Sequence, residues 1–434
     1  MTMWNNGTFD HLAARGCPLR TPIVAACALM LVTAAMADIY QYADCDEDGS
    51  LLLTEQDAEW GVDLSGLYLG CAQLSGAELY LANLNGTDLT DSDLYYANLF
   101  AADLIGADLS GTTMIGSVLS AANLGQADLS GADLTDAYMI QSDLVNASLI
   151  GAHLTFALLS EADLTDADLT GADLTGSNLA DANLLHANLT EVTSGHVTGL
   201  PSTLPEDWNL IGGYLVGPAA NLTNAILEGI DLSETNLTGA NLTEARLLQS
   251  NLQGTNLIEA TLTGVTSGGI TGTPSAFASN WTLVDGYLIG PEANLSEAML
   301  AGSNLSSTNM TSADLTEADL SGADLSSTLF TGANLRGTNL SDTQNWSMAI
   351  WTDAIWDKYT ILPDDMDPEE LGLIYFSICF GDTDESGTVD VEDLLRVLNE
   401  YGSCLDDCLG DLDNSGAVDI EDILILIGGW GECP

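Results

Sequence analysis

Two acidic loops near the C-terminus have a spacing that suits calcium chemistry. In each loop oxygen donors stand at positions 1, 3, 5, 9 and 12, and a glycine at position 6 allows a sharp turn. Calcium takes six to eight oxygen ligands at such spacing, one of them the backbone carbonyl at position 7. We predict ligands in the first loop at Asp382, Asp384, Ser386, Thr388, Asp390 and Asp393, and in the second at Asp411, Asp413, Ser415, Ala417, Asp419 and Asp422.

A third loop near the N-terminus has a related pattern. It fits D-x-D-x-D-G with a glutamate at position 12, which predicts calcium ligands at Asp44, Asp46, Asp48, Ser50 and Glu55. Leu52 stands at position 9, where the ligand is often a water molecule. This loop has no partner loop beside it. A disulfide between Cys45, within the loop, and Cys71 would attach the segment as a cap to the repeats that follow.

The two C-terminal loops are copies of one another, with Asp382 of the first corresponding to Asp411 of the second. An apolar helical pattern follows each loop, with Leu394, Leu395, Val397 and Leu398 after the first and Ile423, Leu424, Leu426 and Ile427 after the second. The cysteines obey the same offset, since Cys379 corresponds to Cys408 and Cys404 to Cys433. This symmetry predicts the disulfides Cys379–Cys404 and Cys408–Cys433, each closing one loop–helix unit.

A five-residue period dominates the middle of the chain. Every fifth residue from Leu64 to Leu189 is leucine, except Met114 and Met139. A small residue usually stands two positions before each leucine, and Asp or Asn one position before it. A step of five residues forms no single face on a helix and changes face on a strand. The chain must therefore turn a corner in every pentapeptide, and four pentapeptides close one square coil with the leucine and the small residue inside.

The repeated spelling A-(D/N)-L-x-x resembles the pentapeptide-repeat family over about residues 62–357. The resemblance implies a mainly β fold, a right-handed quadrilateral β-helix solenoid. Further blocks of repeats run from Leu222 to Leu262 and from Leu295 to Leu340, and the phase slips by one residue near 344–346. An interior this narrow predicts that Ala132 points inward and that a leucine in its place would overpack the core.

Two copies of an insert interrupt the repeats, one beginning at Thr193 and the other at Thr266. Each contains a hairpin pattern with a two-residue turn, Gly212-Gly213 in the first copy and Asp285-Gly286 in the second. Trp208, Tyr214, Trp281 and Tyr287 are either exposed binding residues or residues that pack each hairpin against its neighbour, and we favour packing.

The C-terminal tandem, over about residues 378–434, resembles a type I dockerin because both loops end in aspartate at position 12. The resemblance implies a small α-helical domain that binds a cohesin. Dockerins often carry Ser or Thr at loop positions 10 and 11, whereas this chain has Val391-Glu392 and Ile420-Glu421. Both a cohesin-like partner and a calcium-stabilised module without a cohesin therefore remain open.

The N-terminus has the pattern of an export signal. Arg15 and Arg20 precede an apolar run, and Ala35-Met36-Ala37 fits a cleavage site before Asp38. Six cysteines would remain after cleavage, an even number typical of disulfides in an oxidising compartment. We expect a protein that is secreted or held at the cell surface, the periplasm included. No later apolar run is long enough to span a bilayer.

The predicted domain organisation follows from these patterns. The order is a signal peptide (1–37), an N-terminal cap with the third loop (38–61), repeats (62–190), a hairpin insert (191–219), repeats (220–264), a second insert (265–292), repeats with a C-terminal cap (293–357), a linker (358–377) and the dockerin-like calcium-binding domain (378–434).

Composition narrows the possible functions. The chain has 64 Asp and Glu against 6 Lys and Arg, a formal net charge of −58, so direct binding to nucleic acid is improbable. No catalytic Ser-His-Asp, zinc or phosphate-loop pattern occurs, which favours a non-enzymatic protein. We expect an exported scaffold whose C-terminal module docks onto a protein in a calcium-dependent way. The docking would serve either an assembly with a cohesin-like partner, related to polysaccharides, or tethering at the cell surface.

The alternative is an acidic DNA mimic, since some pentapeptide-repeat proteins resemble duplex DNA and occupy a topoisomerase. Residues 62–190 hold 17 Asp and Glu and no Lys or Arg. At a strand spacing of about 4.8 Å this is one charge per about 1.8 Å, close to the value of about 1.7 Å for duplex DNA. An exported chain would not meet a cytosolic topoisomerase, so location distinguishes the two hypotheses.

Overall fold

The computed structural model describes residues 40–41, 61–376, 388–389, 391–399, 402–403, 412, 417–428 and 431–432. The chain divides into two compact units, Met1–Asn280 and Trp281–Pro434, and the division falls inside the second insert. Each unit is described by itself. The predicted signal peptide, the third loop and most of the two C-terminal loops lie outside the described residues.

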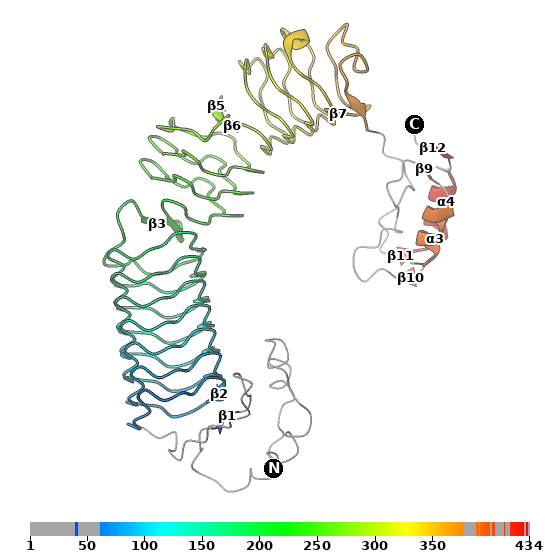
Figure 1. Cartoon of the computed structure of the whole chain (residues 1–434). Helices are drawn as coiled ribbons and strands as arrows, with labels where there is room; N and C mark the ends of the chain where they lie inside the picture. Colours follow the sequence, from blue (N-terminus) through cyan, green and yellow to red (C-terminus); the bar gives the residue numbers. More distant parts are fainter. Residues whose placement is uncertain are drawn as a thin grey trace. The chain divides into compact units, whose positions relative to one another are not determined.

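The repeats of the first unit form stacked coils of four pentapeptides each (Figure 1). Parallel β-bridges join each residue that precedes a central leucine to its equivalent one coil later, as in the series Asp63, Asn83 and Asp103. Backbone hydrogen bonds accompany them; for example, Leu84 N–H donates to Asp103 O at 2.7 Å. These bridges agree with the four-sided coil predicted from the spacing of the leucines.

A tight turn forms each corner of the coil. A backbone hydrogen bond closes it, such as Ala132 N–H to Leu129 O at 3.0 Å. The second corner residue has a positive φ at every fifth position from Gly61 to His196. This is the geometry of a type II turn, which favours glycine at that residue. Several corners nevertheless carry side chains there, among them Tyr96 with φ 52°. The stacked ladder holds these residues in a conformation that a free chain rarely adopts.

The core is a single column of leucines with small residues between them. The central leucines from Leu64 to Leu189 are almost completely buried, and Ala132 is 0% exposed, so the predicted inward position of the alanine is confirmed. Inward Thr and Ser hydroxyls often bond to the backbone; Thr87 Oγ1, for example, donates to Leu64 O at 2.8 Å. At the start of the stack, strand β1 (Tyr40–Gln41) pairs antiparallel with β2 (Ala72–Gln73).

Both inserts contain the expected hairpin. In the first, β3 (Asn209–Ile211) pairs with β4 (Tyr214–Val216) across Gly212-Gly213. In the second, β5 (Thr282–Val284) pairs with β6 (Tyr287–Ile289).

The aromatic residues of the inserts pack as favoured from the sequence. Trp208 lies so close over Gly217 that a Cβ there would be 2.3 Å from the indole ring. The Tyr214 hydroxyl accepts a hydrogen bond from Ile226 N–H at 3.0 Å. In the second insert the Tyr287 hydroxyl accepts the equivalent bond from Met299 N–H at 2.9 Å. Each tyrosine thereby ties its hairpin to the next coil.

The repeats of the second unit end in a wider coil. Asp324 bridges to Gln344, but the next residue in the series, Leu329, bridges to Ile350, which is one position later than the regular repeat would place its partner. The extra residue follows Gln344, and the short 3-10 helix η1 (Trp346–Met348) lies there. This confirms the predicted phase slip. Larger side chains fill the extra room, since Phe330 and Trp351 stack in the core with ring centroids 4.4 Å apart.

The predicted linker, residues 358–377, belongs to the stack through most of its length. Strand β7 (Ile355–Trp356) pairs in parallel with β8 (Ile374–Tyr375), and Met366 and Leu373 are buried. We expected a linker because the five-residue pattern stops near residue 357. The last coil would nevertheless leave an apolar end exposed, and the residues that follow pack against it.

The described residues of the C-terminal region form two short helices and two strand pairs. Helix α3 (Val391–Asn399) and helix α4 (Ile420–Gly428) contact each other. Strand β9 (Thr388–Val389) pairs with β12 (Gly431–Glu432), and β10 (Gly402–Ser403) pairs with β11 (Ala417–Val418). These elements follow the offset between the two loop copies, so each loop–helix unit pairs with the strand that follows the other helix. Val389, Val397, Val418 and Leu426 form the small core.

Candidate functional site: acidic coil faces and C-terminal loops

The outward aspartates of the coils are engaged in hydrogen bonds. Asp168 Oδ1 accepts from the backbone N–H of Thr170 at 3.0 Å and from its hydroxyl at 2.5 Å. Asn188, one coil further, donates to the same oxygen at 3.1 Å. The pattern recurs along the stack, as in the bond of 3.0 Å from Asn183 Nδ2 to Asp163 Oδ1. These carboxylates therefore stabilise the corner that follows them and the coil above.

Hydrogen bonding also lowers the pKa of several of these aspartates. The Ser233 hydroxyl and backbone N–H hold the pKa of Asp231 below its usual value, with a further contribution from Asn251. Ser321 and then Asn339 do the same for the pKa of Asp319. Donors that favour the charged form make a carboxyl group a poor general acid. These aspartates thus stay ionised at neutral pH.

The described histidines lie at outer positions, two of them in the repeats and one in the first insert. His153, His186 and His196 are all exposed, and His186 Nδ1 lies 3.4 Å from Asp166 Oδ1 across two exposed corners. None of these side chains lies in a buried cleft. Within the described part of the chain no group of three His, Cys, Asp or Glu residues could hold a metal ion.

The described part of the second C-terminal loop brings together three of its positions. Asp422, at position 12, is 0% exposed. Its Oδ1 accepts from Leu412 N–H at position 2 (2.6 Å), and its Oδ2 accepts from Asp419 N–H at position 9 (2.8 Å). Asp393, the equivalent of Asp422, is also 0% exposed. A buried carboxylate is costly unless it is hydrogen-bonded, paired or bound to a metal, and the two backbone hydrogen bonds supply part of that compensation for Asp422.

Of the remaining predicted ligands, the structure describes only Thr388 and Ala417. Thr388 lies in β9 and Ala417 in β11, where their backbones pair with other strands. The others lie outside the described residues: Asp382, Asp384, Ser386, Asp390, Asp411, Asp413 and Ser415 in the C-terminal loops, and Asp44, Asp46, Asp48, Ser50 and Glu55 in the N-terminal loop. Cys71 is disulfide-bonded, while its predicted partner Cys45 and the four C-terminal cysteines lie outside the described residues.

The two helices present matching rows of exposed apolar side chains. Val391, Leu395 and Leu398 are 50%, 59% and 48% exposed. Their equivalents in the second copy, Ile420, Leu424 and Ile427, are 59%, 62% and 53% exposed. The apolar helical pattern in the sequence groups most of these residues with the core-forming residues of each helix. The spacing i, i+4, i+7 is the signal that separates them, because it places them on a different face from Leu394 and Val397.

The family comparison agrees with the geometry of the coils. Pentapeptide repeats match in eight copies, at residues 61–94, 97–136, 127–166, 157–193, 219–247, 240–266, 292–326 and 309–344. These segments cover more than half of the chain, and the chain belongs to the pentapeptide-repeat family. No curated protein matches it closely enough in sequence to be called a relative.

Several solved structures are similar to this chain. HetL of the cyanobacterium Nostoc sp. strain PCC 7120, a pentapeptide-repeat protein involved in heterocyst differentiation regulation, is 26% identical over 65% of this chain and 90% of its own, with a TM-score of 0.25. QnrB1, a plasmid-mediated fluoroquinolone resistance protein, is 17% identical over 64% of this chain and 93% of its own, with a TM-score of 0.17. A thylakoid-lumen pentapeptide-repeat protein of Arabidopsis thaliana is 24% identical over 28% of this chain and 68% of its own, with a TM-score of 0.13.

Among the described residues, no helix has the length and the apolar character needed to cross a membrane.

Proposed function

We propose that this chain is an exported, non-enzymatic scaffold whose C-terminal pair of loop–helix units docks onto a protein partner when it is loaded with calcium. The coils supply a polar body, and the C-terminal pair supplies the attachment. A cohesin-like protein or another surface protein would be the partner. The observation that carries this proposal is the pair of matching apolar rows on α3 and α4.

The apolar rows support docking because they are costly to leave in water. Each row places three large aliphatic side chains on one short helix, and every one of them is about half exposed or more. Burying one such side chain completely from full exposure contributes about 1.5–3 kcal/mol, and about half of that remains to be gained here. A partner that covers either row would therefore gain several kcal/mol.

Calcium would act by holding the loops that orient these helices. Asp393 and Asp422 lie in the first turns of α3 and α4 and are fully buried. A cation bound to them would neutralise buried charge and fix the start of each helix. Without it, the acidic loops would repel one another and the small core would have to hold the module alone.

The test is a pull-down with the full chain as bait from extracellular material, with calcium and with EDTA. The double variant Leu395→Asp with Leu424→Asp removes one side chain from each apolar row. Capture of the same protein by the wild type in calcium, and its loss with EDTA and in the double variant, would support the proposal. A partner retained under all these conditions would contradict it.

The matched control is the double variant Thr113→Asp with Thr175→Asp. It adds the same two charges to outward positions of the coils. The control should capture the partner as well as the wild type does.

A DNA-mimic function is the second candidate. It rests on the acidic coil surface, with no Lys or Arg between residues 62 and 190. N-terminal sequencing of the protein made in its own cells tests it directly. A chain that keeps Met1 and stays in the cytosol would favour the mimic, whereas a chain that begins at Asp38 outside the cell would contradict it.

A further inference from the structure

One side of the coils in residues 78–178 differs from the other three. We name this side face D and define it by its outward residues, which are Glu78, Asn98, Val118, Tyr138, Leu158 and Asn178. Parallel bridges join them in that order, one coil apart. Face D holds no aspartate. Each of the other three sides carries a row of them, for example Asp93 and Asp133 on one, Asp103 and Asp143 on another, and Asp108 and Asp128 on the third.

Exposed aromatic side chains gather on face D and on the two corners that border it. Between residues 61 and 190 seven aromatic side chains are exposed, and six of them lie here: Tyr80, Tyr95, Tyr96, Phe100, Tyr138 and Phe156. Some of the rings lie against one another. Tyr80 and Phe100 stack with centroids 5.4 Å apart, and Tyr95 meets Tyr96 edge to face at 4.4 Å.

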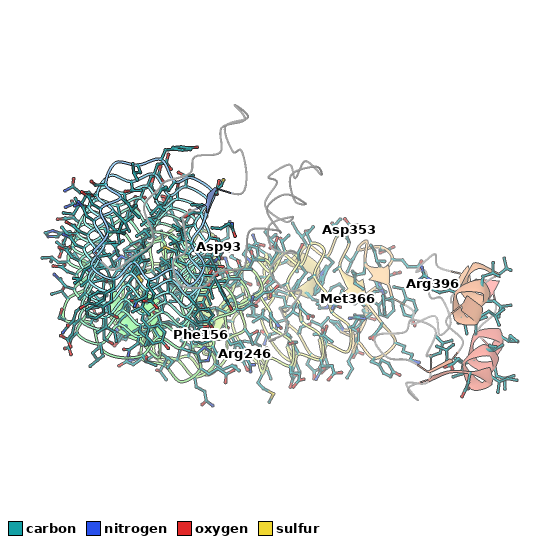
Figure 2. All side chains as sticks on the ribbon, turned by 90° about the horizontal axis from the view of Figure 1, so that it is seen from below. Asp93, Phe156, Arg246, Asp353, Met366 and Arg396 are labelled. Carbon is teal, nitrogen blue, oxygen red and sulfur yellow. The ribbon has the colours of Figure 1, made fainter. Side chains whose placement is uncertain are left out.

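Glycines on the next coil make room for two of these rings. A Cβ at Gly116 would lie 2.4 Å from the Tyr96 ring, and a Cβ at Gly176 would lie 2.4 Å from the Phe156 ring. Tyr96 remains 58% exposed and Phe156 56% exposed, so each ring lies over the next corner and still faces water. Figure 2 labels Phe156 together with Asp93, which belongs to the acidic side next to face D.

Charge determines which kind of partner can cover this surface. Acidic rows flank face D on both sides, and Asp136, Glu161 and Asp181 stand on its corners. No Lys or Arg lies between residues 62 and 190, so nothing in these coils neutralises the flanks. The next such base along the chain, Arg246, already pairs with Glu228 at 2.5 Å. A second copy of the chain would bring acidic rows against acidic rows, and a nucleic acid would bring phosphates.

We propose that face D binds a protein segment that presents an apolar stripe flanked on both sides by Lys or Arg. The stripe would cover Val118, Tyr138 and Leu158, and the basic residues would meet the aspartates of the neighbouring sides. Face D residues from Glu78 to Leu158 come from five successive coils, which span about 19 Å at a strand spacing of about 4.8 Å. An amphipathic helix of about 13 residues has this length.

The experiment measures binding of a synthetic peptide to the full chain by fluorescence anisotropy at physiological salt. The probe is an amphipathic helix of about four turns with a leucine stripe flanked by lysines. Two further peptides serve as comparisons: one with glutamate in place of lysine, and one with the lysine peptide's composition in scrambled order. We expect only the first peptide to bind well. Equal binding of the scrambled peptide would overturn the proposal, because it would mean attraction by net charge alone.

Two variants of the chain separate face D from general electrostatics. Tyr138→Asp places a charge in the centre of face D, and Thr113→Asp places the same charge on the adjacent acidic side. Both are outward positions at which this chain commonly carries aspartate, so both variants should fold. We expect Tyr138→Asp to weaken binding of the lysine peptide about tenfold, the loss of a central contact. Thr113→Asp should leave the affinity unchanged or raise it, because it adds attraction for lysine.

Net-charge binding predicts the same increase for both variants, and that result would overturn the proposal. Sedimentation of the chain without peptide is the second check. A dimer of the wild type that Tyr138→Asp dissociates would assign face D to a second copy, which would also overturn the proposal. Thermal melting of both variants confirms that a lost affinity reflects the surface and not the fold.

Discussion

The coils and the C-terminal loop–helix pair are both rich in aspartate, but they accommodate the carboxylates differently. In the coils, a continuous leucine column and a ladder of backbone hydrogen bonds hold the chain, and the aspartates contribute by hydrogen-bonding to the next corner. In the described part of the C-terminal pair, four buried apolar residues form the core, and Asp393 and Asp422 are buried with it. Carboxylates that face water keep their charge hydrated, whereas the buried charge of Asp422 is held by two backbone hydrogen bonds, and a bound cation would lower its remaining cost. Calcium should therefore matter for one region and not for the other.

Calcium removal gives the largest expected effect. With free calcium at about 100 times the dissociation constant, each predicted site would contribute about 2.7 kcal/mol to the stability of the folded module. We expect EDTA to lower the melting temperature of the C-terminal pair strongly and to leave the coils unchanged. Differential scanning calorimetry of the full chain measures both transitions. Equal shifts of the two melting temperatures, or no shift at all, would contradict the expectation that calcium stabilises only the C-terminal pair.

Overpacking the leucine column should destabilise the coils alone. Ala132 is completely buried between leucines, and Ala132→Leu should cost about 1–3 kcal/mol because the narrow interior has no space for three more carbons. Thermal denaturation followed by circular dichroism measures the loss. Val145→Leu, an enlargement at a partly exposed corner, is the control and should change the melting temperature little. An unchanged melting temperature for Ala132→Leu would contradict its inward position.

Corner glycines provide a smaller test of the coil geometry. Gly116→Ala and Gly131→Ala both place a side chain at positive φ, 64° and 66°, which costs about 1 kcal/mol. A Cβ at Gly131 meets nothing within 4 Å, whereas one at Gly116 meets the Tyr96 ring. Urea denaturation should therefore show a slightly larger loss for Gly116→Ala. If Gly131→Ala proved the more damaging change, the ring would not lie where the structure places it.

The pH dependence of the coils should be the smallest effect. The pKa values of Asp231 and Asp319 are lowered in the folded chain by hydrogen bonds from Ser233 and Ser321. A lowered folded pKa contributes stability above the unfolded pKa, about 3.9, and this stability is lost as the pH falls through the folded value. Denaturation midpoints measured from about pH 6 down to about pH 2 should decrease below about pH 4. Ser321→Ala should reduce that decrease, and an identical profile for the variant would contradict the role of Ser321.

Much of the coil could be predicted from the sequence because its information is local and repeated. The spacing of the leucines requires a corner in every pentapeptide, and the small residue before each leucine requires a narrow interior. The hairpin turns at Gly212-Gly213 and Asp285-Gly286 and the slip near residue 345 are equally local signals. The cover formed by β8 was missed because Ile374 and Tyr375 carry no trace of the repeat, and their pairing with β7 is non-local.

For the candidate sites, too, some features could be predicted from the sequence and others depend on the tertiary structure. The order of oxygen donors along each loop predicts the calcium ligands, because the ligand set is contiguous in sequence. The burial of Asp422 and its bonds to Leu412 and Asp419 depend on how the loop folds around its own helix. The exposure of Leu395 and Leu398 depends on which face of the helix packs into the small core.

The sequence by itself determined the corner period, the leucine column and the acidic character of this protein, since each is a property of a five-residue unit. Only the tertiary structure decided how much of each side chain stays exposed on the side of the coil that lacks aspartate and on its corners. Val118, Tyr138 and Leu158 are far apart in the sequence and look like isolated exceptions to the repeat. The coil predicted from the leucine spacing brings them into one row because every fourth pentapeptide returns to the same side, and the packing of neighbouring coils then sets how much of a ring such as Tyr138 faces water.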